Sequence, residues 1–208
     1  EPTPAAICRA HNNIGTAYQA LNELDLAEEN YRLAQSQAVY GNDRTGEGRA
    51  LGNLGNLFLL RKNYSKAVEY YSDVLQLSKE RSIMSTVYHN RGCAYYEWAE
   101  MKRCSPIPDL TLSAQELYSL AIVDLRETVR LHEEIYQSAK GSSQGLNLSA
   151  LLTESNSRTF HRLQDCLVNL DQSEEALVVA ESTRARSLGE VLLDRSKHIW
   201  PNCNYPLT

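Results

Sequence analysis

The sequence predicts an all-α fold, an α-solenoid of about four stacked helix pairs, and two observations lead to this class. Helix-forming residues dominate, only six prolines occur in 208 residues, and strand-like alternation is missing. A spaced pattern, Ile14-Gly15-x2-Tyr18 and then Ala27-x3-Tyr31-x2-Ala34, returns forty residues later as Leu54-Gly55-x2-Phe58 and Ala67-x3-Tyr71-x2-Val74. A repeat of this length is one helical unit that buries its apolar face only by stacking on its neighbours.

Each unit is expected to be a helix pair with a close contact. Gly15 and Gly55 lack a side chain, so the second helix of the unit can approach the first. The alanine of the second helix, Ala27 or Ala67, packs against the first helix, and the tyrosine four residues later covers the contact.

The third unit carries an insertion. Its first helix is marked by Tyr88, Asn90, Gly92 and Tyr95. The prolines at 106 and 108 then exclude a helix interior, so residues 102–112 are expected to form an inserted loop. The second helix is displaced to residues 113–136, with Ala121 and Leu125 in the small and large positions.

The fourth unit is degenerate, because Leu163, Gln164 and Leu167 stand where the pattern has leucine, glycine and tyrosine. Ala176 restores the register. An extra degenerate repeat within residues 93–163 is an open alternative to the insertion. The expected units are about 8–47, 48–84, 85–140 and 157–195. They form one solenoid domain over residues 1–195, followed by a linker or tail at 196–208.

On these motifs the chain resembles the tetratricopeptide repeat (TPR) family, whose pattern is L-G-x2-Y followed by A-x3-F. The forty-residue period exceeds the ordinary period of about 34 and resembles the extended repeats of LGN-type spindle-orientation adaptors and kinesin light chains. Residues 174–195, with Arg184-Ala185-Arg186, are similar to the helix that joins TPRs to a CHAT domain, a caspase-like fold, in TPR-CHAT proteins.

The composition of the chain argues against several classes of function. The net charge of −5 argues against general nucleic-acid binding, which needs a basic surface. Apolar runs are too short for a membrane span. The five cysteines are scattered, which indicates reduced thiols in a cytoplasmic protein. Neither a nucleophile–base pair nor a metal-ligand motif is found, so we expect no catalytic residue, metal or cofactor, and no enzyme activity.

The resemblance implies that the first helices line a concave groove, with ligand-facing residues at fixed positions of each unit. Taking unit starts at Cys8, Gly48, Ser85 and Ser157, these positions give arginines at 9, 49 and 158 with asparagines beside them. The expected groove residues are Arg9, Asn12, Asn13, Thr16, Arg49, Asn53, Asn56, His89, Asn90, Arg158, His161 and Arg162.

Arginine forks and asparagine amides suit an extended acidic peptide, since they bind carboxylates and peptide backbone. Two plainer interpretations stand beside this one. The arginines can form a solvated face paired with Glu47 or Glu154, and the asparagines can hold neighbouring repeats together by bonding to backbone.

The sequence therefore favours a non-enzymatic scaffold that binds a protein or peptide partner in the groove. The alternative is a regulatory TPR segment that controls a following CHAT domain, with an intramolecular contact to it. A third hypothesis is weak self-association through apolar end faces of the solenoid.

Overall fold

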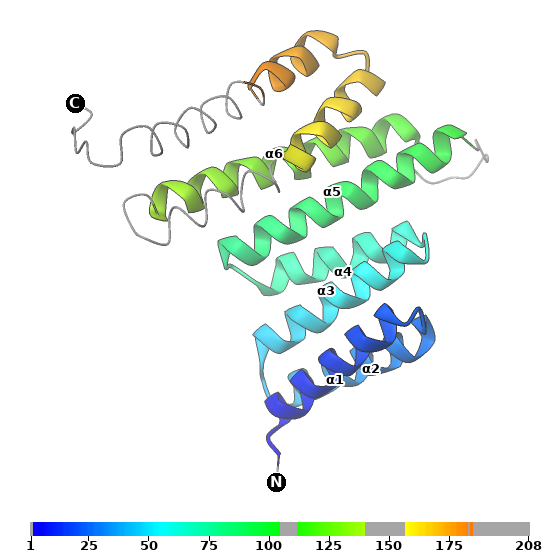
Figure 1. Cartoon of the computed structure of the whole chain (residues 1–208), viewed down its shortest axis with the longest axis vertical. Coiled ribbons are helices and arrows are strands. Elements are labelled where there is room, and N and C mark those ends of the chain that lie inside the picture. Colours follow the sequence, from blue (N-terminus) through cyan, green and yellow to red (C-terminus); the bar gives the residue numbers. More distant parts are fainter. Residues whose placement is uncertain (1, 105–111, 140–156, 183, 185–208) are drawn as a thin grey trace, which may run out of the picture.

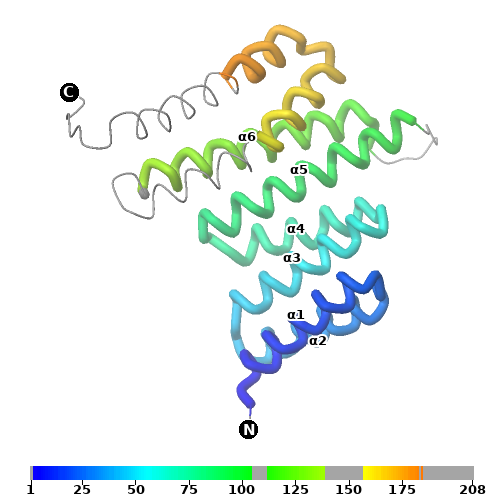
Figure 2. Tube along the Cα trace, in the orientation of Figure 1, coloured from blue at the N-terminus to red at the C-terminus, as the bar shows by residue number. Residues whose placement is uncertain are grey.

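The computed structural model describes residues 2–104, 112–139, 157–182 and 184, and this part of the chain consists of helices joined by short turns. The named helices are α1 (Pro4–Ala20), α2 (Leu24–Tyr40), α3 (Arg44–Leu60), α4 (Tyr64–Leu77), α5 (Arg81–Cys104) and α6 (Ala114–Ala139). Residues 157–169 and 173–182 are also helical. The helices form antiparallel pairs stacked along the long axis (Figures 1 and 2), which confirms the expected all-α solenoid of stacked helix pairs.

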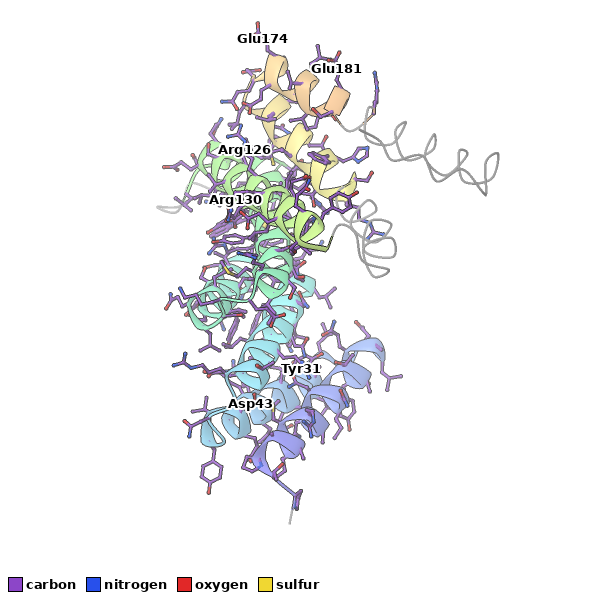
Figure 3. The ribbon with its side chains drawn as sticks, turned by 90° about the vertical axis from the view of Figure 1, so that its left-hand side faces the viewer. Tyr31, Asp43, Arg126, Arg130, Glu174 and Glu181 are labelled. Atoms are coloured by element: carbon purple, nitrogen blue, oxygen red, sulfur yellow. The ribbon has the colours of Figure 1, made fainter. Side chains whose placement is uncertain are left out.

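The two ends of the stack are far apart. Figure 3 shows Tyr31 and Asp43 toward the N-terminal end of the stack, and Glu174 and Glu181 at the opposite end. Consecutive helices from α1 to α6 pack on one another.

The glycine contact predicted for each unit is present. A Cβ on Gly15 would lie 2.6 Å from the ring of Tyr31, and a Cβ on Gly55 would lie 2.6 Å from the ring of Tyr71. Gly92 makes the corresponding contact with Leu125, where a Cβ would lie 3.0 Å from the side chain. Glycine is therefore required at these positions because a ring or a leucine fills the space of its missing side chain.

Side chains near the helix ends fix where several helices begin. The carboxylate of Asp43 accepts a hydrogen bond from the Gly46 amide at 2.9 Å at the start of α3. Before α6, Ser113 and Glu116 form a reciprocal capping box: the Glu116 amide donates to Ser113 Oγ, and the Ser113 amide donates to Glu116. The cap explains why the displaced second helix of the third unit starts where the sequence predicted.

The expected insertion begins later in the sequence than the prolines indicated. Helix α5 continues through Cys104, so residues 102–104 are helical and not part of a loop. Residues 105–111 lie outside the described part of the chain, and so does the whole segment 140–156 that bears on a hidden repeat. The first helices begin at Pro4, Arg44 and Arg81, four residues before the expected unit starts Cys8, Gly48 and Ser85.

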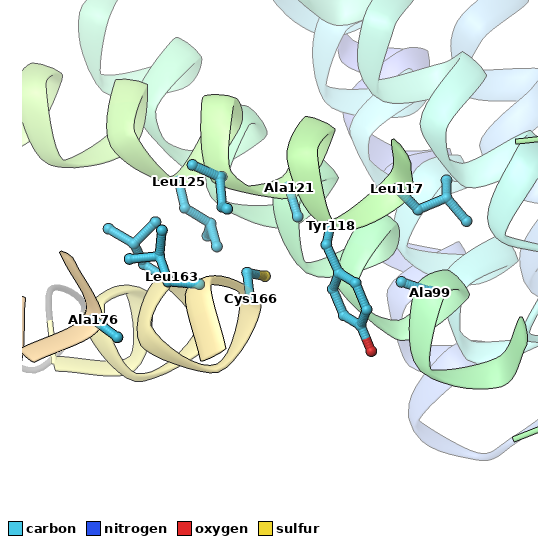
Figure 4. Packing of buried hydrophobic residues seen from close by; sticks show 10 residues of the cluster. Ala99, Leu117, Tyr118, Ala121, Leu125, Leu163, Cys166 and Ala176 are labelled. Atoms are coloured by element: carbon cyan, nitrogen blue, oxygen red, sulfur yellow. The ribbon is translucent and has the colours of Figure 1, made fainter. Parts of the chain in front are cut away.

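The degenerate fourth unit packs on the third through a continuous apolar core (Figure 4). Leu163, Cys166, Leu167 and Ala176 are buried against the apolar side of α6. The α6 residues in this core are Leu117, Tyr118, Ala121, Ile122 and Leu125. The apolar residues of the fourth unit thus keep its place in the stack, although its glycine is lost.

Candidate functional site

The first helices form the inner side of the stack. Helix α1 contacts α3 directly and α3 contacts α5, in addition to the contacts between consecutive helices. Within α1–α6, the second helices α2, α4 and α6 make no such contacts with one another. Helices that lie closer together on one side produce a surface that is concave on that side, so the predicted groove residues lie on the helices of the concave face.

Asparagine side chains connect neighbouring first helices across this face. Asn53 Nδ2 donates to Asn12 Oδ1 at 3.0 Å, joining α3 to α1. Asn90 Nδ2 donates to Asn56 Oδ1 at 3.2 Å, joining α5 to α3, and Tyr71 Oη donates to the same oxygen at 2.7 Å. The structural role that the sequence allowed for the asparagines is therefore present, although the amides bond to each other and not to backbone.

The predicted residues on α1 differ in accessibility. Asn12 is only 3% exposed, and its amide also lies 3.5 Å from Cys8 Sγ, so it belongs to the floor between the helices. Thr16 is exposed and donates its hydroxyl hydrogen to the backbone oxygen of Asn12 at 2.9 Å. Asn13 is exposed.

Arg9 and Arg49 come together at the N-terminal end of the concave face. Arg9 precedes Asn12 by three residues and Arg49 precedes Asn53 by four, so the Asn12–Asn53 bond places both arginines on the same side, one turn earlier. Both are exposed, and neither has an ion-pair partner within the described residues. Burial raises the pKa of the Cys8 thiol and Asp43 adds to this, while Arg49 and Arg9 act in the opposite direction, as two nearby positive charges would.

His89 lies at the junction between α5 and the fourth unit. Its Nδ1 atom is 2.9 Å from Thr159 Oγ1, and its Nε2 atom is 3.6 Å from Cys93 Sγ. Burial lowers the pKa of His89 to about 4, and the positive charges of Arg162, His132 and Arg158 contribute to this shift. The imidazole is therefore neutral at pH 7 and connects two helices.

The remaining predicted residues lie on the helix at 157–169. Arg162 donates to Glu97 at 3.3 Å and stacks over the ring of Tyr96, with its guanidinium carbon 4.9 Å from the ring centre. His161 Nδ1 lies 2.6 Å from the backbone oxygen of Ser157 on its own helix. Arg158 and His161 are exposed, and Arg162 is half-buried. Arg162 therefore holds the fourth unit against α5.

A buried ion pair that the sequence analysis did not predict lies beside the glycine of the third unit. Arg91 donates two hydrogen bonds to the carboxylate of Asp124, at 2.7 and 2.8 Å, and a third to Ser72 Oγ at 2.9 Å. Asp124 is 3% exposed. The pair joins α5 to α6 and α4, and the charged residues directly before Gly92 and Leu125 are the only sequence feature that could have pointed to it.

Reactive and metal-binding chemistry is not apparent in the described residues. Burial raises the pKa of Cys93 to about 11 and that of Cys166 to about 12, so both thiols stay protonated at pH 7. In the described residues, no three side chains of His, Cys, Asp or Glu are arranged to bind a metal ion. Each helix of that part is too short or too polar to cross a lipid bilayer.

The comparison with protein families agrees with the repeat pattern of the first two units. Residues 6–80, which contain the two regular units, match the family model of the tetratricopeptide repeat. No curated protein matches the chain. Among solved structures, BtubC (BKLC) from P. vanneervenii is similar with a TM-score of 0.42 and 14% identity, covering 90% of this chain and 82% of that chain. The two regular units of this chain are therefore similar to tetratricopeptide repeats, and the stack of helix pairs continues beyond them through α5 and α6.

Proposed function

We propose that this chain is a non-enzymatic scaffold that binds an extended acidic segment of a partner protein on its concave face. The repeat architecture supports a role in protein interaction. The observation that carries the acidic preference is the pair Arg9 and Arg49, two exposed guanidinium groups on neighbouring first helices without an ion-pair partner in the described residues.

The arginine pair suits carboxylates for electrostatic and geometric reasons. A guanidinium group offers a planar set of donors that matches a carboxylate, and two such groups side by side favour a segment with neighbouring acidic residues. The whole chain carries a net charge of −5, so these arginines form a local positive site on an acidic protein. A nucleic acid would require a more extensive basic surface.

We propose that the other predicted residues differ in how they contribute to binding the partner's acidic segment. Asn13 is exposed and Asn53 is half-buried one turn after the arginines, within reach of a peptide backbone. Arg162 is already paired with Glu97. We therefore propose that Arg162 mainly stabilises the contact between units and contributes less to ligand binding. We therefore propose that binding is strongest over α1 and α3 and weaker over α5 and residues 157–169.

A selection from a phage-displayed library of random 12-residue peptides tests this proposal. We expect the wild-type chain to select peptides with clustered Asp and Glu. An Arg9→Glu/Arg49→Glu variant should bind those peptides at least about tenfold more weakly, since it replaces two attractive charges by repulsive ones.

The matched control is Lys62→Glu/Lys79→Glu, which changes the net charge by the same amount at two exposed positions outside the first helices. If the selected peptides lack acidic residues, the acidic preference is contradicted, but the proposal that the chain is a peptide-binding scaffold stands. Equal loss in both variants would show an effect of net charge alone. If no peptide is selected, the groove proposal itself is wrong.

A second proposal, control of a following CHAT domain, rests on the sequence pattern of residues 174–195. Only residues 174–182 and 184 of this segment are described, and they are helical. The test is the sequence that follows Thr208 in the full-length protein. A caspase-like domain there would support control of that domain, and any other sequence would remove the proposal.

A further inference from the structure

Helix α1 presents an apolar seam on the side that faces away from α3. Its residues are spaced three and four apart, which places them on one side of a helix. Ile14 is 43% exposed and Leu21, at the end of the helix, is 71% exposed. Ala10 and Ala17 are also exposed, and Ile7 is half-buried. The seam consists of Ile7, Ala10, Ile14, Ala17 and Leu21.

The corresponding residues of α3 show what such a seam is for. Forty residues after Ala10, Ile14 and Ala17 stand Ala50, Leu54 and Leu57, and all three are completely buried. Ala50 packs with Ala34 and Ala38, and Leu54 and Leu57 pack with Ala27 and Tyr31 of α2. The α1 seam therefore has the composition of a helix-packing surface, but no helix of the described chain covers it.

The order of side chains in the seam favours a second copy of the same chain. Large and small residues alternate symmetrically about Ile14: isoleucine, alanine, isoleucine, alanine, leucine. If two α1 helices pack antiparallel about a two-fold axis, Ile14 meets Ile14, Ala10 faces Ala17, and Ile7 faces Leu21. A two-fold contact requires such self-complementarity, and small residues opposite each other allow the helices to approach closely.

The charges around the seam are compatible with this contact. Helix α1 has one charged residue, Arg9, and no carboxylate. Helix α2, beside the seam, carries Asp25, Glu28 and Glu29 against the single cation Arg32. An α1 helix from a second copy therefore brings no carboxylate toward the acidic residues of α2. Leu26 and Leu33 of α2, each 41% exposed, extend the apolar surface next to the seam.

We propose that this chain forms a homodimer in which α1 packs antiparallel on α1 of a second copy, with a two-fold axis at Ile14. The inference goes beyond the proposed groove, because Arg9 projects from a different side of α1 than the seam. Dimerisation through the seam leaves both concave faces open, so the peptide selection described above tests the groove separately.

Sedimentation equilibrium of the full chain over a concentration series tests the dimer. We expect self-association in the micromolar range, and at least about tenfold weaker association for Ile14→Glu, which places two carboxylates at the centre of the contact. The control Val123→Glu changes another exposed apolar residue, which lies on α6 and is 62% exposed, and should leave the association unchanged. Circular dichroism checks that both variants remain helical.

Cysteine cross-linking tests the register. In a Cys104→Ser/Cys203→Ser background, Ile14→Cys should form a disulfide-linked dimer under mild oxidation, whereas Val123→Cys should not. A wild-type chain that is monomeric at high concentration would overturn the proposal and leave the seam to a helix of another protein. A dimer that tolerates Ile14→Glu, or that does not cross-link through Ile14→Cys, would place the contact elsewhere.

Discussion

The two halves of the concave face use their polar residues differently. Over α1 and α3, asparagine amides join the helices and the arginines Arg9 and Arg49 have no ion-pair partner in the described residues. Over α5 and residues 157–169, His89 and Arg162 are engaged in contacts between units. The first half contains the two units in which a tyrosine ring covers the glycine. The second half contains α5, whose Gly92 meets Leu125, and the unit in which Gln164 replaces the glycine.

This difference shows how a repeat that has lost its consensus glycine stays in the stack. In the regular units the ring of Tyr31 or Tyr71 fits over the glycine, and this contact fixes the pair of helices. The fourth unit keeps its apolar core against α6 and adds polar contacts from His89, Glu97 and Tyr96 to its own helix. Those polar residues are then less available to a ligand.

The largest expected effect is at the buried ion pair that joins α5 to α6 within the third unit. Arg91→Met leaves the buried carboxylate of Asp124 without its partner, and we expect it to lower the free energy of unfolding by about 3–4 kcal/mol. Urea denaturation at pH 7 measures this. The control Arg126→Met removes an ion pair with Glu175 whose two side chains are about half exposed, and should cost less than about 1 kcal/mol.

A double variant distinguishes the lost pair from lost packing. Arg91→Met/Asp124→Leu removes both charges, so it should be clearly more stable than Arg91→Met alone. If the single variant costs less than about 1 kcal/mol, the ion pair does not stabilise the contact between α5 and α6.

The second-largest expected effect is a difference in stability cost between a variant of a regular unit and a variant of the degenerate unit. Gly55→Val places methyl groups where the ring of Tyr71 lies, and we expect a loss of about 3 kcal/mol. Gln164→Val should cost less than about 1 kcal/mol, because this unit does not use a glycine contact. The measurement is thermal unfolding followed by circular dichroism.

Gly52→Val is the control on the same helix as Gly55. A Cβ on Gly52 would have no neighbour within 4 Å, so this variant should be close to neutral. A similar loss for the variants at 52 and 55 would mean that helix propensity, and not the ring contact, explains the requirement for glycine.

A smaller effect depends on pH and is confined to the second half. The pKa of His89 is about 4 in the folded chain and about 6.5 in an unfolded chain, so the unfolded state binds more protons between these values. The stabilisation from neutral His89 is therefore complete above pH 6.5 and is lost as the pH falls toward 4. We expect a loss of about 2 kcal/mol, with amides of residues 157–169 exchanging fastest.

The comparison variant for this prediction is His89→Gln. Glutamine retains polar atoms near Thr159 but does not titrate, so the difference in stability between variant and wild type should vary with pH from 6.5 to 4. A difference that stays constant over this range would assign the acid sensitivity of the chain to other groups.

The fold could be predicted from the sequence because its determinants are local. The glycine, alanine and tyrosine positions of one unit lie within about 20 residues, and their spacing encodes a helix pair directly. The capped start of α6 was also readable, since Ser113 and Glu116 are three residues apart. The helical end of α5 was not, because the prolines that exclude a helix lie a few residues beyond Cys104.

The candidate site was less predictable because its contacts join different units. His89 and Thr159 are seventy residues apart, and Arg91 and Asp124 are separated by the insertion. Register alone places Asn12 and Arg9 on the same helix face. It does not show that Asn12 is buried by a bond from Asn53 while Arg9 remains exposed.

The amide links on the concave face affect how quickly a complex would form and dissociate. A peptide that took over the bonds of Asn53 or Asn56 would exchange one hydrogen bond for another of the same kind, with little net gain in free energy. The selectivity of the proposed site then depends on Arg9 and Arg49, which act at long range through charge. Such a complex should form rapidly, have a short residence time, and weaken as ionic strength rises.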